Sequence, residues 1–409
     1  MDHEQCEYYK RNGSCYFGVK KKNGSYKIHI GTEDKLEILK EYSESWIRAI
    51  LTDSKNKYMQ YSGAVFIDCM SSSGKYVNKL NNNVLGTSLR VLDILGKMKN
   101  TYPTKKLKLI LNDKGKQEIL CQKCRTELLN NMNIEVIIKN QDVREFLSEI
   151  KDKSDLGNNY HTLLFYDPFK AEIYWDEIGK YLKGTRFDLV LTHFHQNDTQ
   201  RVINTANISE KVKKKYEKTY GVSFDELVTK LQGKSGREMS GILRELLIVN
   251  MKKVLGDYHA YVSCLPVFNQ KNKDVYDIVI YSKSSGALEK FKNAVFKVMS
   301  KRVELYDKMD QKELSLITDT INQASIFDMK DIYYFYSVKT FARIIAVEFS
   351  NKRISNDILG DFIKYHDFIP TNIKDKIDPW LIEKYSVVIE KEKRKKFYVF
   401  PDLGEGDIF

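Results

Sequence analysis

Four aspartates follow apolar, strand-like segments, and their spacing suits the binding of a ligand. Asp68 ends AVFID, Asp113 ends KLKLILND, Asp142 ends IEVIIKNQD, and Asp167 directly follows HTLLFY. In an open α/β sheet, ligands bind in the crevice outside the carboxyl ends of the strands. Carboxylates at that edge can bind a ribose diol, an adenine amino group or the reacting centre. A single aspartate there is more often a helix cap or turn residue, but four at the spacing of a βα unit favour a binding site.

The segment after Asp68 is a loop of small residues. It reads Cys-Met-Ser-Ser-Ser and then Gly74, so it includes Ser72. Small residues between a strand and a helix allow backbone N–H groups to approach a ligand. This loop contains a single glycine. We therefore regard it as a weak motif when taken alone.

Two further patterns resemble metal-binding motifs. His193 and His195 lie two residues apart at a strand end and so face one way, but no third ligand is evident in the sequence. Cys121 and Cys124 form a CxxC without a second CxxC, inside a helical pattern. We expect no metal site: a hydrogen-bonded or solvent-facing histidine pair and buried helical cysteines are the preferred interpretations.

The elements that must position these residues alternate between strands and helices. Apolar runs predict strands at 64–68, 106–113, 134–142, 161–169 and 187–194, with helices between them at 87–98, 116–129 and 143–150. A helix from Thr32 onward is indicated by four apolar residues at helical spacing, namely Leu36, Leu39, Tyr42 and Trp46. This alternation predicts βαβ units and a mostly parallel sheet, hence an α/β fold with helices on both faces.

Three regions are expected along the chain. Residues 1–31 form a polar N-terminal lead-in, and 32–302 form the α/β domain, with a Lys-rich helical insertion at 205–255. Strand signals return at 258–268 and 274–283, which suits an antiparallel hairpin closing the same sheet.

The C-terminal region, 303–409, has the outline of a winged helix: two helices followed by a charged β-ribbon. Its second helix is expected to bury Ile373, Ile377, Leu381 and Ile382. The ribbon turn carries Lys393, Arg394, Lys395 and Lys396, where backbone phosphates could be neutralised. A hairpin whose charges only protect an edge strand is the alternative.

The amino-acid composition limits the classes of protein to which the chain can belong. The chain has 409 residues, 67 Lys and Arg against 55 Asp and Glu, and a net charge of +12. This excess of positive charge points toward a polyanionic partner. We find no run of eighteen apolar residues and no signal peptide at the N-terminus, and the six cysteines do not suggest a disulfide framework. We therefore expect a cytoplasmic protein without a membrane partner.

Several motifs in order resemble a known family. They are TEDKLEILKEYSESW, VFIDCMSSSGKY, GTSLRVLDIL, LFYDPFK and VYDIVIYSKSSG. Together they resemble the three-Cys-motif partner (TcmP) proteins, Rossmann-like class I methyltransferases that depend on S-adenosylmethionine. The resemblance covers the chain from about Thr32 to the C-terminus. Each motif is short, so the order and spacing of the motifs are the signal.

The resemblance implies a role for each candidate residue. Asp68, Ser72 and Gly74 would form the S-adenosylmethionine loop, Asp113 would bind the ribose and Asp142 would approach the adenine. The catalytic strand end would be Asp167, Pro168 and Phe169, with Phe169 available to stack a flipped base. A partner protein of the three-Cys-motif type and a role in phage defence are implied only by association with the family.

The chain departs from the family pattern at the cofactor loop. Ser72 stands where the family has glycine, and its Cβ could forbid a positive φ. Lys170 follows Asp-Pro-Phe in place of a glycine. The first hypothesis is a methyltransferase acting on or with nucleic acid, which the retained Asp-Pro-Phe favours. The second, favoured by the altered loop, is a lapsed fold that binds nucleic acid or a partner protein. The third and weaker is a metal-dependent nuclease using Asp68 and Asp167.

Overall fold

The computed structural model divides the chain into two compact units, 1–269 with 273–284, and 270–272 with 285–409. The structure describes residues 27–28, 30–52, 61–78, 82–130, 134–152, 160–168, 172–182, 186–195, 199–203, 205, 207–256, 259–268, 274–308, 337–366 and 369–403. Most of the predicted lead-in at 1–31, together with Phe169 and Lys170, lies outside these residues.

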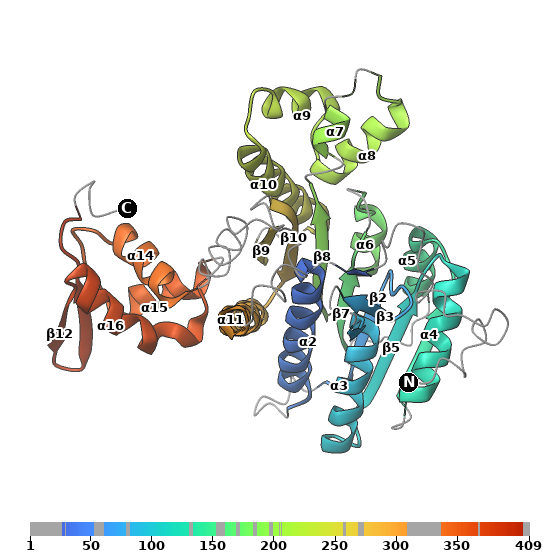
Figure 1. The fold of residues 1–409 in the computed structure, drawn as a ribbon, viewed down its shortest axis with the longest axis horizontal. Helices are drawn as coiled ribbons and strands as arrows, with labels where there is room; N and C mark the ends of the chain where they lie inside the picture. The colour runs from blue at the N-terminus through green and yellow to red at the C-terminus, as the bar shows by residue number, and fades with distance from the viewer. Residues whose placement is uncertain are drawn as a thin grey trace. The chain divides into compact units, whose positions relative to one another are not determined.

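The first unit is built on a seven-stranded sheet with the order β6-β5-β2-β7-β8-β10-β9 (Figure 1). The strands are β2 (Gly63–Asp68), β5 (Lys106–Asn112), β6 (Glu135–Lys139), β7 (Tyr160–Tyr166), β8 (Arg186–Phe194), β9 (Tyr261–Phe268) and β10 (Asp274–Ser282). The strands from β6 to β8 pair in parallel, and β10 pairs antiparallel with both β8 and β9. This is the strand order of a Rossmann-like class I methyltransferase sheet, and the predicted closing hairpin is confirmed.

Helices cover both faces of the sheet, which explains why its central strand β2 is apolar up to its last residue, Asp68. All six residues of β2 are buried, as expected for a central parallel strand. On one face lie α2 (Ile30–Leu51), α3 (Thr87–Thr101) and α4 (Lys116–Leu129). On the other lie α5 (Val143–Asp152), α6 (Trp175–Leu182) and α10 (Gly236–Leu255). The predicted stripe of α2 is buried, and the helix begins at Ile30, two residues before Thr32.

The stretch predicted as a helical insertion lies between β8 and β9. After α7 (Thr199–Ile203) it holds α8 (Glu210–Tyr220), α9 (Phe224–Leu231) and α10. Gly221 follows α8 with φ +73°, a C-terminal position that favours glycine. Ser235 and Glu238 form a capping box at the start of α10. These boundary residues fix where each helix of the insertion begins and ends.

A small second sheet flanks the loop after β2. It has the order β1-β3-β4, from β1 (Lys27–Ile28), β3 (Lys75–Asn78) and β4 (Asn83–Leu85). The backbone N–H of Gly86 donates to the carbonyl of Gly74 over 2.7 Å, so the β3–β4 hairpin returns the chain to the loop. The sequence analysis did not predict this hairpin.

The second unit begins with α11 (Ser285–Lys308), so the division lies at Ser285 and not at the predicted boundary of 303, which falls inside this helix. The unit continues with α14 (Val338–Glu348), β11 (Arg353–Ser355), α15 (Asn356–Tyr365), η3 (Thr371–Ile373), α16 (Lys374–Tyr385), β12 (Val388–Glu392) and β13 (Lys395–Val399). The strands form an antiparallel sheet of order β11-β13-β12. The buried ammonium of Lys292 on α11 donates to three carbonyls at the end of α15, at 2.7–2.9 Å.

The core of the second unit differs from the prediction at one position. Ile373, Ile377 and Leu381 are fully buried, but Ile382 is 48% exposed, so its placement in the buried stripe was wrong. On a helix, the residue next to Leu381 points about 100° away from it, beyond the edge of a narrow stripe. No helix among the described residues has both the length and the apolar composition to cross a membrane.

Candidate functional site

The carboxyl edge of the sheet gathers the four aspartates that the sequence predicted. Asp68 ends β2, and Asp113, Asp142 and Asp167 follow β5, β6 and β7. These four strands are consecutive neighbours in the sheet. The parallel register therefore places all four residues along one edge, in the position where this class of fold binds ligands.

Asp68 is a buried acid at the centre of this edge, with 2% of its surface exposed. Its Oδ1 accepts a hydrogen bond from the backbone N–H of Met70 at 3.1 Å. Burial, reinforced by the charges of Asp167 and Asp113, raises its pKa to about 8 despite that hydrogen bond and the nearby Lys35 ammonium. Asp68 is therefore a protonated carboxyl at neutral pH.

Asp167 forms an ion pair with Lys35, near the start of helix α2. The Nζ atom of Lys35 lies 2.6 Å from Asp167 Oδ2 and 5.5 Å from the centre of the Tyr276 ring. Burial, followed by the charges of Asp167 and Asp34, raises the pKa of the Tyr276 phenol, which stays protonated. Asp167 Oδ1 is buried and accepts no hydrogen bond from the described residues. Oδ2 of Asp167 is thus paired with Lys35, whereas Oδ1 can accept a hydrogen bond from a ligand.

Asp113 holds the loop after β2 in place. Its Oδ2 accepts from the backbone N–H of Ser72 and its Oδ1 from that of Gly115, each at 2.8 Å. Ser72 has φ +51°, so the expectation that serine could forbid a positive φ at this position was wrong. Serine pays a steric penalty of about 1–2 kcal/mol in this conformation, and the charge-assisted hydrogen bond to Asp113 offsets it.

Gly74, at the end of the loop, has a backbone conformation and close neighbours that favour glycine. Its φ is +75°, and a Cβ atom there would lie 2.3 Å from Oε1 of Gln122 and 3.0 Å from Leu89. Arg125 on the same helix as Gln122 donates to the carbonyl of Ser73. Helix α4 therefore supports the loop from behind, and Gly74 leaves room for it.

Asp142 combines a structural contact with a place at the candidate site. Its Oδ1 accepts from the backbone N–H of Arg144 at 3.1 Å at the start of α5, and Lys114 lies 3.1 Å from its Oδ2. The Arg144 hydrogen bond is the largest influence that lowers the pKa of Asp142, and Lys114 adds to it. The capping role that we weighed for these aspartates thus applies to Asp142.

A cavity of about 230 Å³ lies along this edge. Its apolar or weakly polar lining is Cys69, Met70, Val143, Tyr166, Pro168 and Tyr174, and its polar lining is Asn112, Asp113, Lys114, Gln141, Asp142 and Glu172. Of the candidate catalytic residues, Pro168 lines the cavity, Asp167 pairs with Lys35, and Phe169 lies outside the described residues.

A larger cavity of about 440 Å³ shares Glu172 and Tyr174 with the first. Helix α8 contributes Lys211, Lys214, Lys215 and Lys218 to its lining. Lys215 is paired with Glu172 at 2.5 Å and Lys218 with Asp176 at 3.9 Å. Within the described part of the chain, no carboxylate forms an ion pair with Lys211 or Lys214. The two cavities thus meet at Glu172 and Tyr174.

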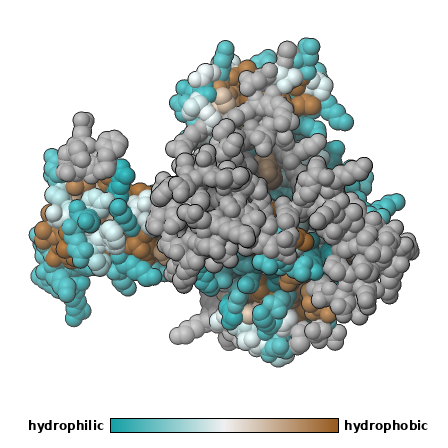
Figure 2. Space-filling model, in the orientation of Figure 1, coloured by the Kyte–Doolittle hydropathy of each residue, from teal (hydrophilic) through white to brown (hydrophobic). Residues whose placement is uncertain are grey.

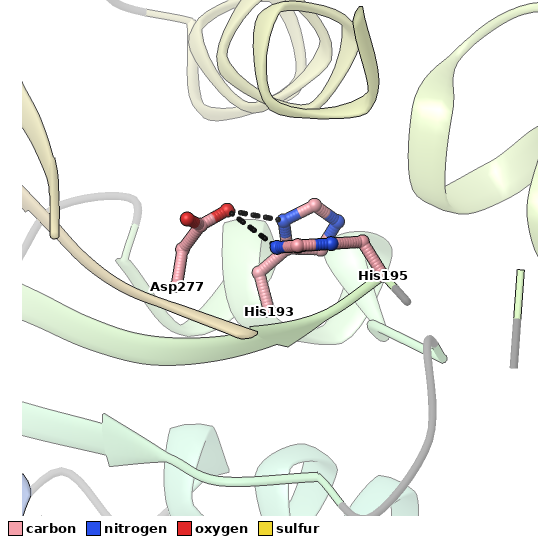
Figure 3. A group of neighbouring side chains, drawn as sticks. All are labelled: His193, His195 and Asp277. Carbon is pink, nitrogen blue, oxygen red and sulfur yellow. Dashed lines mark hydrogen bonds and ion pairs between the residues drawn. The ribbon is translucent and has the colours of Figure 1, made fainter. Parts of the chain in front are cut away.

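His193 and His195 form a group with a residue that the sequence analysis missed. Figure 3 shows one oxygen of Asp277 facing both imidazole rings. Asp277 lies on β10 directly opposite His193 on β8, and all three side chains are buried. The pair is buried and hydrogen-bonded, not solvent-facing, and its third partner was not evident in the sequence because strand pairing supplies it from 84 residues away.

The basic ribbon turn of the second unit joins β12 and β13. Lys393 and Arg394 occupy the turn, with Lys393 at φ +54°, and Lys395 follows at the start of β13. These three residues are exposed. Lys396 instead contacts Asp378 at 2.5 Å and the ring of Tyr398. The lower tip of this unit is hydrophilic in Figure 2.

Lys35, Tyr276 and Asp277 were the functional candidates that the sequence analysis did not identify. Lys35 belongs to the TEDK opening that resembles the family motif, so a signal for it was present. Tyr276 and Asp277 lie on β10, whose antiparallel pairing with β8 brings them to the carboxyl edge. Both residues lie in VYDIVIYSKSSG, which also resembles a family motif, but that resemblance assigned no role to either of them.

The comparisons with known proteins return distant structural likenesses. A Legionella pneumophila protein, LPL1258, matches at 10% identity with a TM-score of 0.35, covering 60% of this chain and 84% of that chain. A SAM-dependent methyltransferase from Agrobacterium tumefaciens matches at 11% identity with a TM-score of 0.32, covering 63% of each chain. An O-methyltransferase from Bacillus cereus, solved in complex with SAH, matches at 8% identity with a TM-score of 0.32, covering 69% of this chain and 92% of that chain.

No protein-family model matches the chain, and no curated protein matches it. The resemblance to the three-Cys-motif partner family thus stays a prediction. The fold assignment rests on the strand order of the sheet, and the distant likenesses add no argument of their own.

Proposed function

We propose that this protein is an S-adenosylmethionine-dependent methyltransferase whose second unit binds nucleic acid. The observation that carries the proposal is the placement of Asp68, Asp113 and Asp167 on adjacent strand ends, beside a 230 Å³ cavity at the carboxyl edge of the sheet. A site of this fold is built from strand-end residues and the loops between them, and these are the residues that line the edge.

The cavity residues fit the adenosine part of the cofactor. A carboxylate offers about four acceptor positions, so Asp113 retains two for ribose hydroxyls after accepting from Ser72 and Gly115. Met70, Val143 and Pro168 supply apolar walls for a purine, as small-molecule sites generally do. When bound, the cofactor supplies an electrophilic methyl group on a sulfonium.

The residues at the reacting end have complementary roles. Asp68 presents a buried carboxyl beside the loop, and a cationic group bound there would draw it toward the ionised form. Asp167 Oδ1 is available to accept a hydrogen bond from an amine or hydroxyl of the methyl acceptor, while Lys35 holds Oδ2 and fixes the orientation of the carboxylate.

The larger cavity supports an anionic methyl acceptor. It meets the cofactor cavity at Glu172 and Tyr174, and Lys211 and Lys214 on α8 have no ion pair among the described residues. Ammonium groups of this kind attract phosphates, so a nucleic acid strand entering along α8 would reach Asp167 from the side of that cavity.

The second unit supports the same substrate class. From α14 onward, its order of helix, strand, two α-helices and two strands, with β11 paired to β13, supports the proposal of a winged helix. Lys393, Arg394 and Lys395 extend from the ribbon turn and can neutralise backbone phosphates. Lys396 is less available than predicted, because it is paired with Asp378.

One observation favours a second candidate, a binding module without catalysis. Both oxygens of Asp113 already accept hydrogen bonds from the protein backbone, one from Ser72 in the loop after β2 and one from Gly115 before α4, so Asp113 holds this loop without a ligand. The nuclease hypothesis is less favoured, because the Lys35 ammonium occupies the position beside Asp167 that a catalytic cation would need.

The test is transfer of a tritiated methyl group from S-adenosylmethionine to DNA and RNA pools. We expect incorporation into one nucleic acid, and a loss of at least about 100-fold in Asp167→Asn, the usual range for a positioned acid or base. Asp225→Asn, an exposed position on α9, is the control and should retain activity. Cofactor binding without transfer to DNA, RNA or protein would support the binding module and contradict the proposed methyltransferase activity.

A further inference from the structure

The face of the sheet beneath α8 and α10 carries a polar cluster that the proposed methyltransferase site does not use. His193 and His195 come from the end of β8, and Asp277 comes from β10. The three side chains are 0–1% exposed, and one ligand-type atom from each lies within 4.8 Å of the others. Two imidazoles and a carboxylate form one of the donor sets that bind Zn²⁺ in proteins.

We propose that His193 Nδ1, His195 Nε2 and Asp277 Oδ2 bind a Zn²⁺ ion that fastens the helical insertion to the sheet. Three protein ligands leave one position of a tetrahedral ion for water. The site is independent of the S-adenosylmethionine proposal, since it shares no residue with either cavity.

The two distances from Asp277 to the histidines suit a tetrahedral ion. Asp277 Oδ2 lies 3.1 Å from His193 Nδ1 and 3.4 Å from His195 Nε2. Ligand atoms bound at about 2.0–2.1 Å to tetrahedral zinc are about 3.3 Å apart. Both imidazoles therefore already point at one oxygen with the spacing that an ion between them would require (Figure 3).

Each ligand also has the outer contact that metal ligands usually have. The remote nitrogen of His193, Nε2, lies 3.0 Å from the hydroxyl of Tyr220 on α8. The remote nitrogen of His195, Nδ1, lies 3.1 Å from the hydroxyl of Ser240 on α10. Arg244, also on α10, donates to the other oxygen of Asp277 at 2.7 and 3.1 Å. Such partners fix ring orientation and ligand basicity in metal sites.

The hydrogen bond of Ser240 favours the tautomer that a metal needs. Ser240 Oγ donates to the carbonyl of Gly236 one turn earlier, at 3.0 Å. With its proton committed there, Ser240 accepts from Nδ1–H of His195. The lone pair of Nε2 then faces the carboxylate of Asp277, an arrangement that a cation between the two groups makes favourable.

The outer contacts define what the ion does. Its ligands lie on the sheet, and the groups that hold those ligands lie on α8 and α10. Helix α8 also forms the lysine wall of the 440 Å³ cavity. The ion therefore orders the insertion, and its removal should loosen α8 and α10 before the remaining sheet.

The direct test is metal analysis of the untagged full chain. After stripping with a chelator, reloading with Zn²⁺ and desalting, we expect about one zinc per chain. A Co²⁺-loaded sample should show the visible bands of a tetrahedral site with nitrogen and oxygen donors. No retained zinc, or a Co²⁺ spectrum dominated by thiolate charge transfer, which would point to Cys121 and Cys124, would overturn the proposal.

Variants locate the ion. His195→Gln and Asp277→Asn should abolish stoichiometric zinc, and Ser240→Ala, a mild change, should weaken zinc affinity about 10–100-fold through its outer contact. The matched control is His161→Gln. His161 is also hydrogen-bonded to an aspartate, Asp188, at 3.1 Å in the same sheet, but no second histidine of the described residues is paired with that aspartate.

Hydrogen exchange tests the structural role without relying on a variant that folds. In the wild-type chain, zinc should slow exchange in α8 and α10 and leave the wing ribbon at 388–399 unchanged. Zinc affinity that is equal in wild type and Ser240→Ala, or exchange in α8 and α10 that does not respond to zinc, would overturn the proposal.

Discussion

Replacing Asp68 by asparagine should make the protein more stable, by an amount that grows with pH. Burial and its acidic neighbours raise the pKa of Asp68 to about 8 in the folded chain, against 3.8 for the free side chain. Between these two values the folded state holds a proton that the unfolded state has released. Folding stability therefore falls as pH rises through this window, and is constant above it.

The size of the effect follows from the window. Each pH unit corresponds to about 1.4 kcal/mol per group, and three units separate pH 5 from about pH 8. The stability advantage of Asp68→Asn over wild type should therefore increase by about 4 kcal/mol between pH 5 and pH 9. Asparagine retains an Oδ1 acceptor for the Met70 N–H, so the turn is preserved.

Urea unfolding at pH 5, 7 and 9 measures this difference. A Trp380→Phe background removes the tryptophan of the second unit, so that the buried Trp46 and Trp175 report the first unit alone. Asp142→Asn is the control, because the pKa of Asp142 is lowered in the folded chain and both of its states are ionised above pH 5. An advantage of Asp68→Asn that stays constant from pH 5 to pH 9 would refute the buried protonated carboxyl.

Three other perturbations test the loop, the ion pair and the ribbon. Gly74→Ala should lower stability by more than the roughly 1–2 kcal/mol expected from its positive φ alone, because the new Cβ meets Gln122. The control is Gly233→Ala, at φ +73° with open space around it, which measures the backbone cost alone. Equal melting temperatures of the two variants would contradict the crowding at Gly74. Lys35→Met should destabilise the chain by about 3–5 kcal/mol by leaving Asp167 partly buried without its cation, and denaturant unfolding should show partial recovery when Asp167→Leu is added; a neutral single variant would contradict this. Changing Lys393, Arg394 and Lys395 together to alanine should reduce the log–log salt slope of nucleic acid binding by up to about three in fluorescence anisotropy, whereas Lys97→Ala should not; an unchanged slope would make the second unit a protein-docking domain.

The parallel half of the fold could be predicted because each element carries its own local signal. Helix α4 was predicted with its observed limits at 116–129, and the five parallel strands β2, β5, β6, β7 and β8 each contain an apolar run. Asp68, Asp113 and Asp167 belong to the candidate edge and do not serve only as helix caps. The fourth aspartate, Asp142, caps helix α5. The spacing of acids along a βα pattern was therefore enough to locate the edge.

The remaining features depend on contacts between distant residues. The ion pair of Lys35 with Asp167 spans 132 positions, and the approach of Asp277 to His193 spans 84. The positive φ of Ser72 is compensated by Asp113, 41 residues later, so the serine alone suggested the wrong outcome. The boundary at Ser285 was missed because α11 continues across 303 without a break in its helical pattern.

Calorimetric titration with S-adenosylmethionine and S-adenosylhomocysteine tests the central claim most directly. We predict saturable binding with one site per chain, weakened by about 1.5–3 kcal/mol in Asp113→Ala, the range for hydrogen bonds to a charged group. The control Asp93→Ala, on the exposed face of α3, should bind as wild type does. No binding of either ligand at about 1 mM, or equal affinity in Asp113→Ala and wild type, would contradict the assignment of this edge as a cofactor site.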